Sequence, residues 1–256
     1  MLTERSATVA AAVKLQRHVG RRRANRFLAE GPNLVGAAAA RGLVCEVFAT
    51  ESAAERHASL LDGRQWPVHL VTDRAAKALS DTVTPVGLVA VCDMPATRLQ
   101  DVLAGSPRLI AVAVEIGEPG NAGTLIRIAD AMGAAAVVLA GNSVDPYNGK
   151  CLRASAGSIF SVPVVVASEA HEAVAGLRAA GLRLLATTVD GEMPLDQADL
   201  SAPTAWLFGP EAHGLPAEIS AAADHRVRIP MSGGAESLNV AAAAAICLYQ
   251  SARALA

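Results

Sequence analysis

The chain has few cysteines, and their positions exclude two classes of site. Its four cysteines, at positions 45, 92, 151 and 247, are far apart and form no C-x-x-C pair. The sequence therefore predicts neither a disulfide framework nor a zinc cluster, and we expect buried thiols. The six histidines show neither H-x-x-x-H nor H-E-x-x-H spacing, so we expect no metal site.

Long hydrophobic runs are also lacking. No continuous apolar run reaches the roughly 20 residues that a membrane-spanning helix needs. Glu4 and Arg5 are not followed by the hydrophobic core of a signal peptide. We therefore expect a soluble, cytoplasmic protein with no membrane partner. Its 256 residues, 52% hydrophobic and 18% charged, can bury the core of one large domain or two smaller ones.

Acidic residues are absent from positions 5–29, which hold a basic cluster instead. The seven basic residues there are Arg5, Lys14, Arg17, Arg21, Arg22, Arg23 and Arg26. Arginine, whose planar fork suits phosphate, outnumbers lysine. The cluster predicts a polyanionic partner such as nucleic acid, and the alternative is a solvated helix face.

The hydrophobic pattern divides the chain into two α/β parts. Residues 1–95 predict helices at 6–18, 33–40, 51–61 and 73–79, and strands at 26–30, 43–49, 68–71 and 86–92. Residues 96–107 contain prolines and glycine and read as a linker. From residue 108 the strands are more apolar, at 109–116, 136–140, 162–166, 182–188, 205–208 and 227–229. Helical stretches between most of them predict a parallel sheet covered on both faces.

Two of these apolar runs end in loops rich in glycine and proline. The first loop contains Gly209 and Glu211, and the second contains Ser237 and Asn239. Glycine lets a backbone approach a small molecule closely, and the polar residues offer a few placed groups beside it. Gly-Pro-Glu is also a common turn, and Ser237 before an alanine-rich stretch is also a plausible N-cap.

The loop at residues 117–123 and the helix after it form a third candidate. Its glycine spacing, G-x-x-G-x-x-G, fits neither a dinucleotide fingerprint nor a P-loop. Leu125, Ile128, Ala129 and Met132 stand at helical spacing and predict a core stripe, which leaves Arg127 pointing away from the core. Arg127 can lean back toward the Asn121 loop, although an exposed arginine on such a helix is also commonplace.

Together these three segments resemble, in order, the three motifs of the SpoU/TrmH branch of the SPOUT RNA methyltransferases. They read NAGTLIR at 121–127, LFGPEAHG at 207–214 and IPMSGGAESLN at 229–239, and the resemblance covers residues 108–256. DPYN at 145–148 and RASAG at 153–157 resemble the ribosomal RNA 2′-O-ribose methyltransferases, including the thiopeptide-resistance type. Residues 1–95, with FLAEG at 27–31, resemble the ribosomal-protein-L30-like substrate-binding domain. Pro210 stands where the second motif usually has asparagine, so that amide contact is absent.

The resemblance implies a fold and a cofactor. A smaller L30-like α/β domain would precede a C-terminal SPOUT domain, in which a parallel sheet carries a deep trefoil knot. S-adenosylmethionine would bind in the knot. The residues implied for its binding are Gly209, Ile229 and Leu238, with Thr187 and Thr188 close by. The family also works as a homodimer in which Arg127 would approach the donor site of the other subunit, and the alanine run at 241–245 would allow a close helix contact.

The activity that the resemblance implies is methylation of a ribose 2′-hydroxyl in structured RNA, with 23S ribosomal RNA favoured over transfer RNA. The resemblance implies that Arg127 lies at the hydroxyl. We favour a role for Arg127 as a cation over a role as a base, because a guanidinium stays protonated. Asn121, Glu211, Ser237 and Asn239 would position the hydroxyl and the RNA phosphate. The residues expected to contact RNA are Arg17, Arg21, Arg22, Arg23, Arg26 and Arg153. Alternatives are a transfer RNA 2′-O-methyltransferase and a non-catalytic RNA-binding ribosome-assembly factor; base methylation is disfavoured because the motifs match the ribose branch.

Overall fold

The computed structural model describes residues 1–255, which fall into two compact units. The first unit contains Met1–Ala96 and Tyr147–Phe160, and the second contains Thr97–Pro146 and the chain from Ser161 onward. The sequence placed residues 108–256 together in one continuous domain. The structure differs at one segment, because residues 147–160 make their contacts in the first unit.

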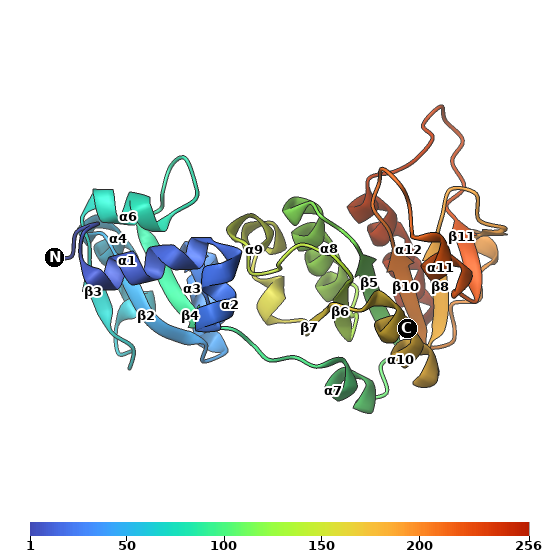
Figure 1. Ribbon diagram of the computed structural model, residues 1–256, viewed down its shortest axis with the longest axis horizontal. Coiled ribbons are helices and arrows are strands. Elements are labelled where there is room, and N and C mark those ends of the chain that lie inside the picture. The colour runs from blue at the N-terminus through green and yellow to red at the C-terminus, as the bar shows by residue number, and fades with distance from the viewer. Residues whose placement is uncertain (256) are drawn as a thin grey trace. The chain divides into compact units, whose positions relative to one another are not determined.

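The first unit is built on a mixed four-stranded sheet with the order β1-β4-β2-β3 (Figure 1). Strand β4 runs antiparallel to β1 and β2, and β3 runs parallel to β2. The strands are β1 (Arg26–Glu30), β2 (Val44–Ala49), β3 (Val68–Leu70) and β4 (Leu88–Asp93). The helices are α1 (Ala7–Val13), η1 (Lys14–Gln16), α2 (His18–Ala24), α3 (Pro32–Ala40), α4 (Glu51–Arg56), α5 (Ala58–Leu61), α6 (Asp73–Leu79), α9 (Gly149–Ser155) and η2 (Ser158–Phe160).

Local sequence explains most of these boundaries. Pro32 opens α3, and the hydroxyls of Thr50 and Thr72 accept hydrogen bonds at the first turns of α4 and α6. The sequence prediction ended its first helix at residue 18 and gave no helix to the arginine run at 21–23, but this run lies within the helix α2. It was also wrong about a continuous helix at 51–61, because His57 interrupts it.

Residues 147–160 pack against β1 through aromatic rings. The centre of the Tyr147 ring lies 4.8 Å from that of the Phe27 ring, and the centre of the Phe160 ring lies 6.0 Å from it. Arg153 forms an ion pair with Asp81. The segment therefore contributes both apolar surface and a charge pair to the first unit.

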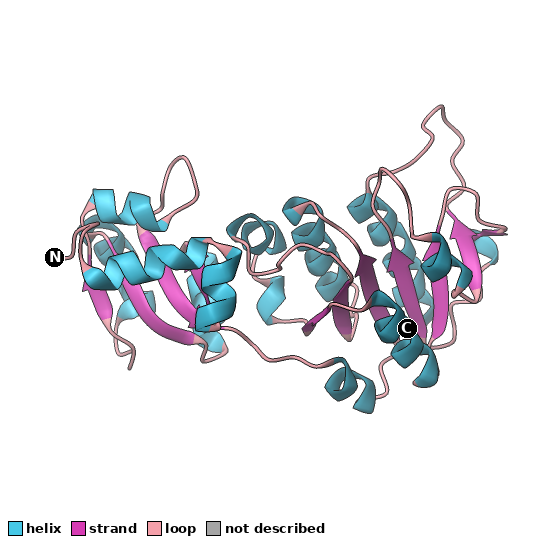
Figure 2. Ribbon diagram, viewed as in Figure 1, coloured by secondary structure: helices cyan, strands magenta, loops and turns pink. Residues whose placement is uncertain are grey.

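The second unit is built on a seven-stranded sheet with the order β7-β6-β5-β10-β8-β11-β9 (Figure 2). All neighbouring strands are parallel, as the sequence predicted. The strands are β5 (Leu109–Val114), β6 (Ala136–Ala140), β7 (Val164–Ala167), β8 (Arg183–Thr187), β9 (Met193–Pro194), β10 (Thr204–Phe208) and β11 (His225–Arg228). The helices are α7 (Leu99–Ala104), α8 (Pro119–Ala131), α10 (Ala170–Ala179), η3 (Leu195–Gln197), α11 (Ala217–Ala221) and α12 (Val240–Leu255).

Helices cover both faces of this sheet, so its central strands are buried along their whole length. One face of β5 and β10 packs against α7, α10 and α11, with Leu177 and Leu207 in that layer. The other face packs against α8 and α12, where the buried Trp206 donates a hydrogen bond of 2.8 Å to Ser251 of α12. These observations confirm the α/β fold class with its parallel sheet, and the knot stays a prediction.

Helix α8 differs slightly from the predicted stripe. Leu125 and Ala129 are fully buried as expected, but Ile126 is buried in place of Ile128, and Met132 is only half-buried. The buried side of α8 packs against α12, β5 and β6. Within residues 1–255 no helix has both the length and the apolar character needed to span a bilayer.

Candidate functional site

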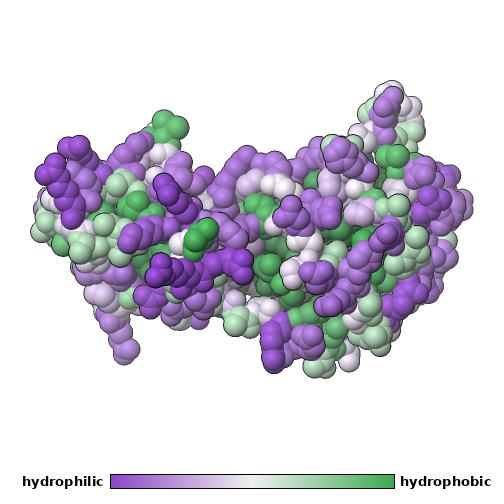
Figure 3. Space-filling model, in the orientation of Figure 1, coloured by the Kyte–Doolittle hydropathy of each residue, from purple (hydrophilic) through white to green (hydrophobic). Residues whose placement is uncertain are grey.

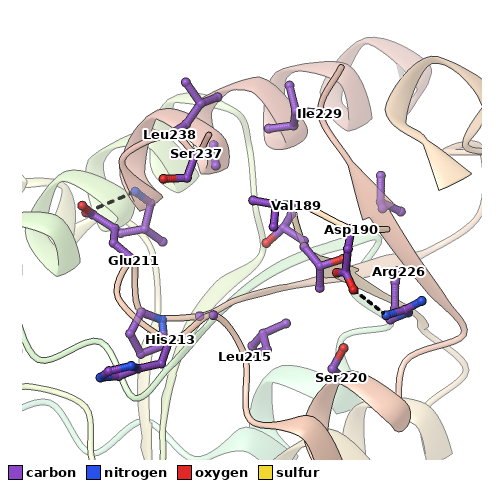
Figure 4. Close-up of a pocket in the computed structure, with 18 of the residues that line it drawn as sticks. Val189, Asp190, Glu211, His213, Leu215, Ser220, Arg226, Ile229, Ser237 and Leu238 are labelled. Carbon is purple, nitrogen blue, oxygen red and sulfur yellow. Dashed lines mark hydrogen bonds and ion pairs between the residues drawn. The ribbon is translucent and has the colours of Figure 1, made fainter. Parts of the chain in front are cut away.

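A cavity of about 750 Å³ lies at the carboxyl ends of β8, β10 and β11 (Figure 4). Three loops of the second unit line it, and each follows one of these strands. All five residues that the sequence associated with a cofactor contribute to the lining: Thr187, Thr188, Gly209, Ile229 and Leu238. In open parallel sheets, the carboxyl ends of the strands are the usual place for a ligand.

The cavity combines apolar walls with a few polar groups. Figure 4 shows Ile229, Leu238 and Val189 toward one side of the space and Leu215 toward the other. The hydroxyl oxygen of Thr188 is buried and has no hydrogen-bond partner among the described residues. A buried hydroxyl of this kind normally finds a partner, so it offers a bonding position to a ligand.

Three polar residues from three distant segments meet beside this cavity. The Nδ2 amide of Asn121 donates to Oε1 of Glu211 at 2.8 Å, and the Nδ2 amide of Asn239 donates to the same oxygen at 2.7 Å. Asn239 Nδ2 also lies 3.0 Å from Oδ1 of Asn121. One carboxylate oxygen therefore joins the first turn of α8, the loop after β10 and the start of α12.

Asn239 also fixes the start of α12. Its Oδ1 atom accepts hydrogen bonds from the backbone N–H groups of Ala241 at 3.0 Å and Ala242 at 3.3 Å. The N-cap of α12 is therefore Asn239, whereas the sequence offered Ser237 as a possible cap. Ser237 instead lines the cavity, exposed and without a hydrogen bond to any described residue.

Gly209 faces the protein backbone. A Cβ atom placed on Gly209 would lie 2.4 Å from the backbone nitrogen of Leu215 and 2.6 Å from the carbonyl carbon of Gly214. The glycine therefore permits the loop 209–215 to fold back on itself at the cavity wall. The sequence had explained Gly209 by close approach of a cofactor, and the structure supplies a different reason.

Arg127 is exposed on α8 and does not line the cavity of its own chain. Its guanidinium forms no hydrogen bond or ion pair with any residue from 1 to 255. The predicted orientation away from the core is therefore confirmed. The structure brings Asn121, Glu211 and Asn239 together, with Ser237 in the cavity lining, but it does not bring Arg127 to them.

Comparison with known proteins identifies the family. Residues 108–249 match the model of the SpoU rRNA Methylase family. The chain belongs to this family. Residues 7–90 match the model of the MRM3-like substrate binding domain.

Similar proteins extend over nearly the whole chain. The 23S rRNA (guanosine(2553)-2′-O)-methyltransferase RlmP of Bacillus subtilis is 35% identical over 92% of this chain and 92% of its own length. Among solved structures, the SpoU methyltransferase AviRb of Streptomyces viridochromogenes in complex with the cofactor AdoMet has a TM-score of 0.85 and 32% identity, covering 97% of this chain and 98% of its own. The AdoMet-bound rRNA methyltransferase of Sinorhizobium meliloti has a TM-score of 0.87 and 30% identity, covering 100% of this chain and 98% of its own.

Sequence reasoning missed a charged network on the cavity wall of this family member. Arg226 of β11 contacts Asp190 and Glu192, two acids in the segment after β8. The backbone N–H of Arg226, together with its guanidinium, lowers the pKa of Glu192. The acids lie 36 and 34 positions from Arg226, so no local spacing signalled the network.

Glu118 was also missed, although a local signal for it existed. Its carboxylate accepts a hydrogen bond of 2.7 Å from the backbone N–H of Asn121 and so caps α8. Pro119 follows at the first position of the helix, which is the usual place for a helix-starting proline. An acid directly before such a proline indicates a helix start.

The arginines expected to contact RNA divide into three kinds. Arg21 is only 3% exposed and donates hydrogen bonds to the carbonyl oxygens of Leu15 at 3.0 Å and Gln16 at 2.8 Å. The expectation that Arg21 contacts phosphate is therefore wrong, because its guanidinium is buried and holds η1.

The other five arginines are exposed, but two of them have acidic partners. Arg26 pairs with Asp93, which raises the pKa of the guanidinium, and Arg153 pairs with Asp81. Arg17, Arg22 and Arg23 form no ion pair within the described residues. Figure 3 shows strongly hydrophilic residues gathered around α2 on the drawn face, with hydrophobic residues among them.

Proposed function

We propose that this chain transfers the methyl group of S-adenosylmethionine to a ribose 2′-hydroxyl of 23S ribosomal RNA. The observation that carries the proposal is the meeting of three distant family motifs at one cavity, through the bonds of Asn121 and Asn239 to Glu211. The relatives support it, because RlmP is named as a 23S rRNA 2′-O-methyltransferase and matches 92% of both chains.

The cavity suits the methyl donor in size and chemistry. Its volume of about 750 Å³ lies within the roughly 300–1,000 Å³ of typical small-molecule sites. Thr188 offers an unpartnered buried hydroxyl, and Ile229 and Leu238 offer apolar surface. When bound, S-adenosylmethionine supplies a methyl group that is already electrophilic because it is attached to a sulfonium. The protein then has to align the 2′-hydroxyl and lower its pKa, so that its proton passes to water as the oxygen attacks the methyl group.

Arg127 is the residue that we assign to the hydroxyl. A guanidinium keeps its positive charge in proteins, so it lowers the pKa of a nearby hydroxyl and stabilises the developing oxyanion. Asn121, Glu211, Ser237 and Asn239 position the hydroxyl and the adjoining phosphate. Because Arg127 is exposed and lies outside its own cavity, we assign it to the cavity of a second subunit.

A homodimer follows from this assignment, and α12 offers a surface for it. Ile246 and Tyr249 are 37% and 50% exposed on its outer side, and the guanidinium of Arg253 lies 5.9 Å from the centre of the Tyr249 ring. Of the alanine run at 241–245, Ala241 and Ala244 are buried within their own chain. The contact between subunits therefore uses the outer side of α12 more than the alanine run.

The test measures methyl transfer from radiolabelled S-adenosylmethionine to purified 23S ribosomal RNA and to transfer RNA. Arg127→Ala should leave the melting temperature and donor affinity near those of the unsubstituted protein. It should reduce single-turnover methylation by about two to four orders of magnitude. Arg127→Lys should be nearly as poor, because lysine lacks the fork that holds a hydroxyl and a phosphate together.

A mixing experiment tests whether Arg127 acts on the partner subunit. The Arg127→Ala protein is mixed with the Leu238→Arg protein so that dimers of one chain of each form. Leu238→Arg places a charge in the donor cavity, and each protein alone should be inactive. Mixed dimers contain one intact cavity facing one intact Arg127, so activity should return. If verified mixed dimers are inactive, Arg127 does not act in the partner's cavity. If the Arg127→Ala protein turns over at the wild-type rate, Arg127 has no catalytic role.

A further inference from the structure

The segment 188–192 passes over the end of β11. Val227 of β11 pairs with Thr187 of β8 on one side and with Met193 of β9 on the other. The chain between residues 187 and 193 must therefore cross β11 at its carboxyl end. On the way it lines the cavity with Thr188, Val189 and Asp190.

Secondary structure alone holds this segment weakly. Strand β9 has only two residues and lies at the edge of the sheet. Val189 is 65% exposed although it is apolar, because it faces the open cavity (Figure 4). A short edge pairing gives little stability, so another interaction must keep Thr188 and Val189 in place.

Two features fasten the segment to β11. A Cβ atom on Gly191 would lie 2.7 Å from the backbone oxygen of Arg226 and 2.8 Å from the backbone nitrogen of Arg228, so the two main chains are in direct contact. The guanidinium of Arg228 donates to the carbonyl oxygen of Gly191 at 2.8 Å.

Arg226 adds bonds on both sides of Gly191. Its Nε atom donates to Oε2 of Glu192 at 3.0 Å, and its backbone N–H donates to Oε1 of the same carboxylate at 3.0 Å. Its Nη1 atom donates to Oδ2 of Asp190 at 3.3 Å, a contact drawn as a dashed line in Figure 4. The planar fork of arginine can hold two carboxylates at once, which a lysine ammonium does less well.

We propose that Arg226 is a positioning residue for methyl-donor binding. By holding Asp190 and Glu192 it keeps Thr188 and Val189 on the cavity wall in the arrangement that the donor needs. The inference rests on the proposed function, because it assigns the cavity to S-adenosylmethionine. Arg226 acts on binding of the donor and not on the transfer step, so its loss should raise KM for the donor and leave kcat nearly unchanged.

The experiment measures S-adenosylmethionine binding by calorimetry for the unsubstituted protein and for Arg226→Ala. Exposed ion pairs contribute modestly, so we expect donor affinity to fall roughly three- to tenfold. KM for the donor should rise by a similar factor, while kcat at saturating donor changes less than about twofold. Raising the salt concentration should narrow the difference in affinity, because salt screens the pairs between Arg226 and the two acids.

Two further variants separate positioning from general destabilisation. Arg226→Lys should restore part of the affinity. Arg98→Ala removes an arginine that forms an exposed ion pair with Asp101 in α7, and it should leave donor affinity unchanged. A double-mutant cycle of Arg226→Ala with Glu192→Gln should show non-additive losses in donor affinity.

The outcomes distinguish the inference from the function on which it rests. If the unsubstituted protein binds no S-adenosylmethionine, the proposed function fails and the inference fails with it. If that protein binds the donor and Arg226→Ala binds it equally well, only the inference is refuted. Equal losses of affinity in Arg226→Ala and Arg98→Ala refute it as well, and so does a loss confined to kcat.

Discussion

Replacing Asn239 tests whether the polar cluster beside the cavity connects the three motif segments. In Asn239→Ala two effects combine. Loss of the N-cap of α12 costs about 1 kcal/mol. Loss of the amide bonds to Glu211 and Asn121 adds less than about 1 kcal/mol, because the cluster is open to solvent. The free energy of unfolding of the second unit should therefore fall by about 1–2 kcal/mol.

The two tryptophans allow this unit to be followed separately. Trp206 is fully buried in the second unit and bonded to Ser251 of α12, whereas Trp66 belongs to the first unit. In a Trp66→Phe background, tryptophan fluorescence reports only the surroundings of Trp206, which include its contact with α12. A domain of about 150 residues loses roughly 2–4 °C in melting temperature per kcal/mol, so Asn239→Ala should lower the Trp206 transition by about 2–8 °C.

Asn239→Ser separates the two effects. Serine is a good N-cap but lacks the amide N–H groups, so it should recover most of the stability while donor affinity stays below that of the unsubstituted protein. Asn148→Ala is a matched control, because Asn148 caps α9 in the first unit and should leave the Trp206 transition unchanged. If Asn239→Ser binds S-adenosylmethionine as tightly as the unsubstituted protein, the bonds between the loops do not shape the cavity, and the reasoning is wrong.

Two further predictions concern the arginines of α2 and the glycines of the cavity loops. Replacing Arg22 and Arg23 together by alanine should weaken RNA binding and reduce the slope of log affinity against log salt by roughly 0.7 for each lost contact with single-stranded RNA. If the salt slope of this double variant is unchanged, Arg22 and Arg23 form only a solvated surface. Arg21→Ala should instead lower the free energy of unfolding of the first unit by about 1–3 kcal/mol in thermal unfolding, since its bonds to η1 are buried. Gly209→Ala should lower donor affinity and melting temperature together, because its Cβ would meet the backbone of Leu215, whereas Gly234→Ala has open space and should change neither. Equal calorimetric affinities for these two glycine variants would contradict that explanation.

Most of the fold could be predicted from the sequence because its signals are local. Strands β1 and β6 and helix α6 begin and end where hydrophobic periodicity placed them. The parallel sheet followed from apolar strands separated by helical stretches. The loops that line the cavity were recognised from their glycines and prolines, and the polar motif residues were named from the resemblance of three segments to the family motifs.

Position within the folded chain could not be predicted from local spacing. Arg21, Arg22 and Arg23 are adjacent and chemically identical, yet only Arg21 is buried, because the turn of α2 aims it at the carbonyl groups of η1. The segment 147–160 follows the second unit's strand β6 in sequence but packs in the first unit, because Tyr147 and Phe160 bury their rings against Phe27.

The sequence by itself determined which groups are available for chemistry, because side-chain identity and the strand-to-loop pattern are properties of neighbouring residues. The tertiary structure decided which of those groups meet. Glu211 bonds to Asn121 and Asn239, 90 and 28 positions away, and Arg226 bonds to acids more than 30 positions away. Such contacts depend on strand order and on the paths of loops between strands, because these bring residues far apart in the chain within bonding distance.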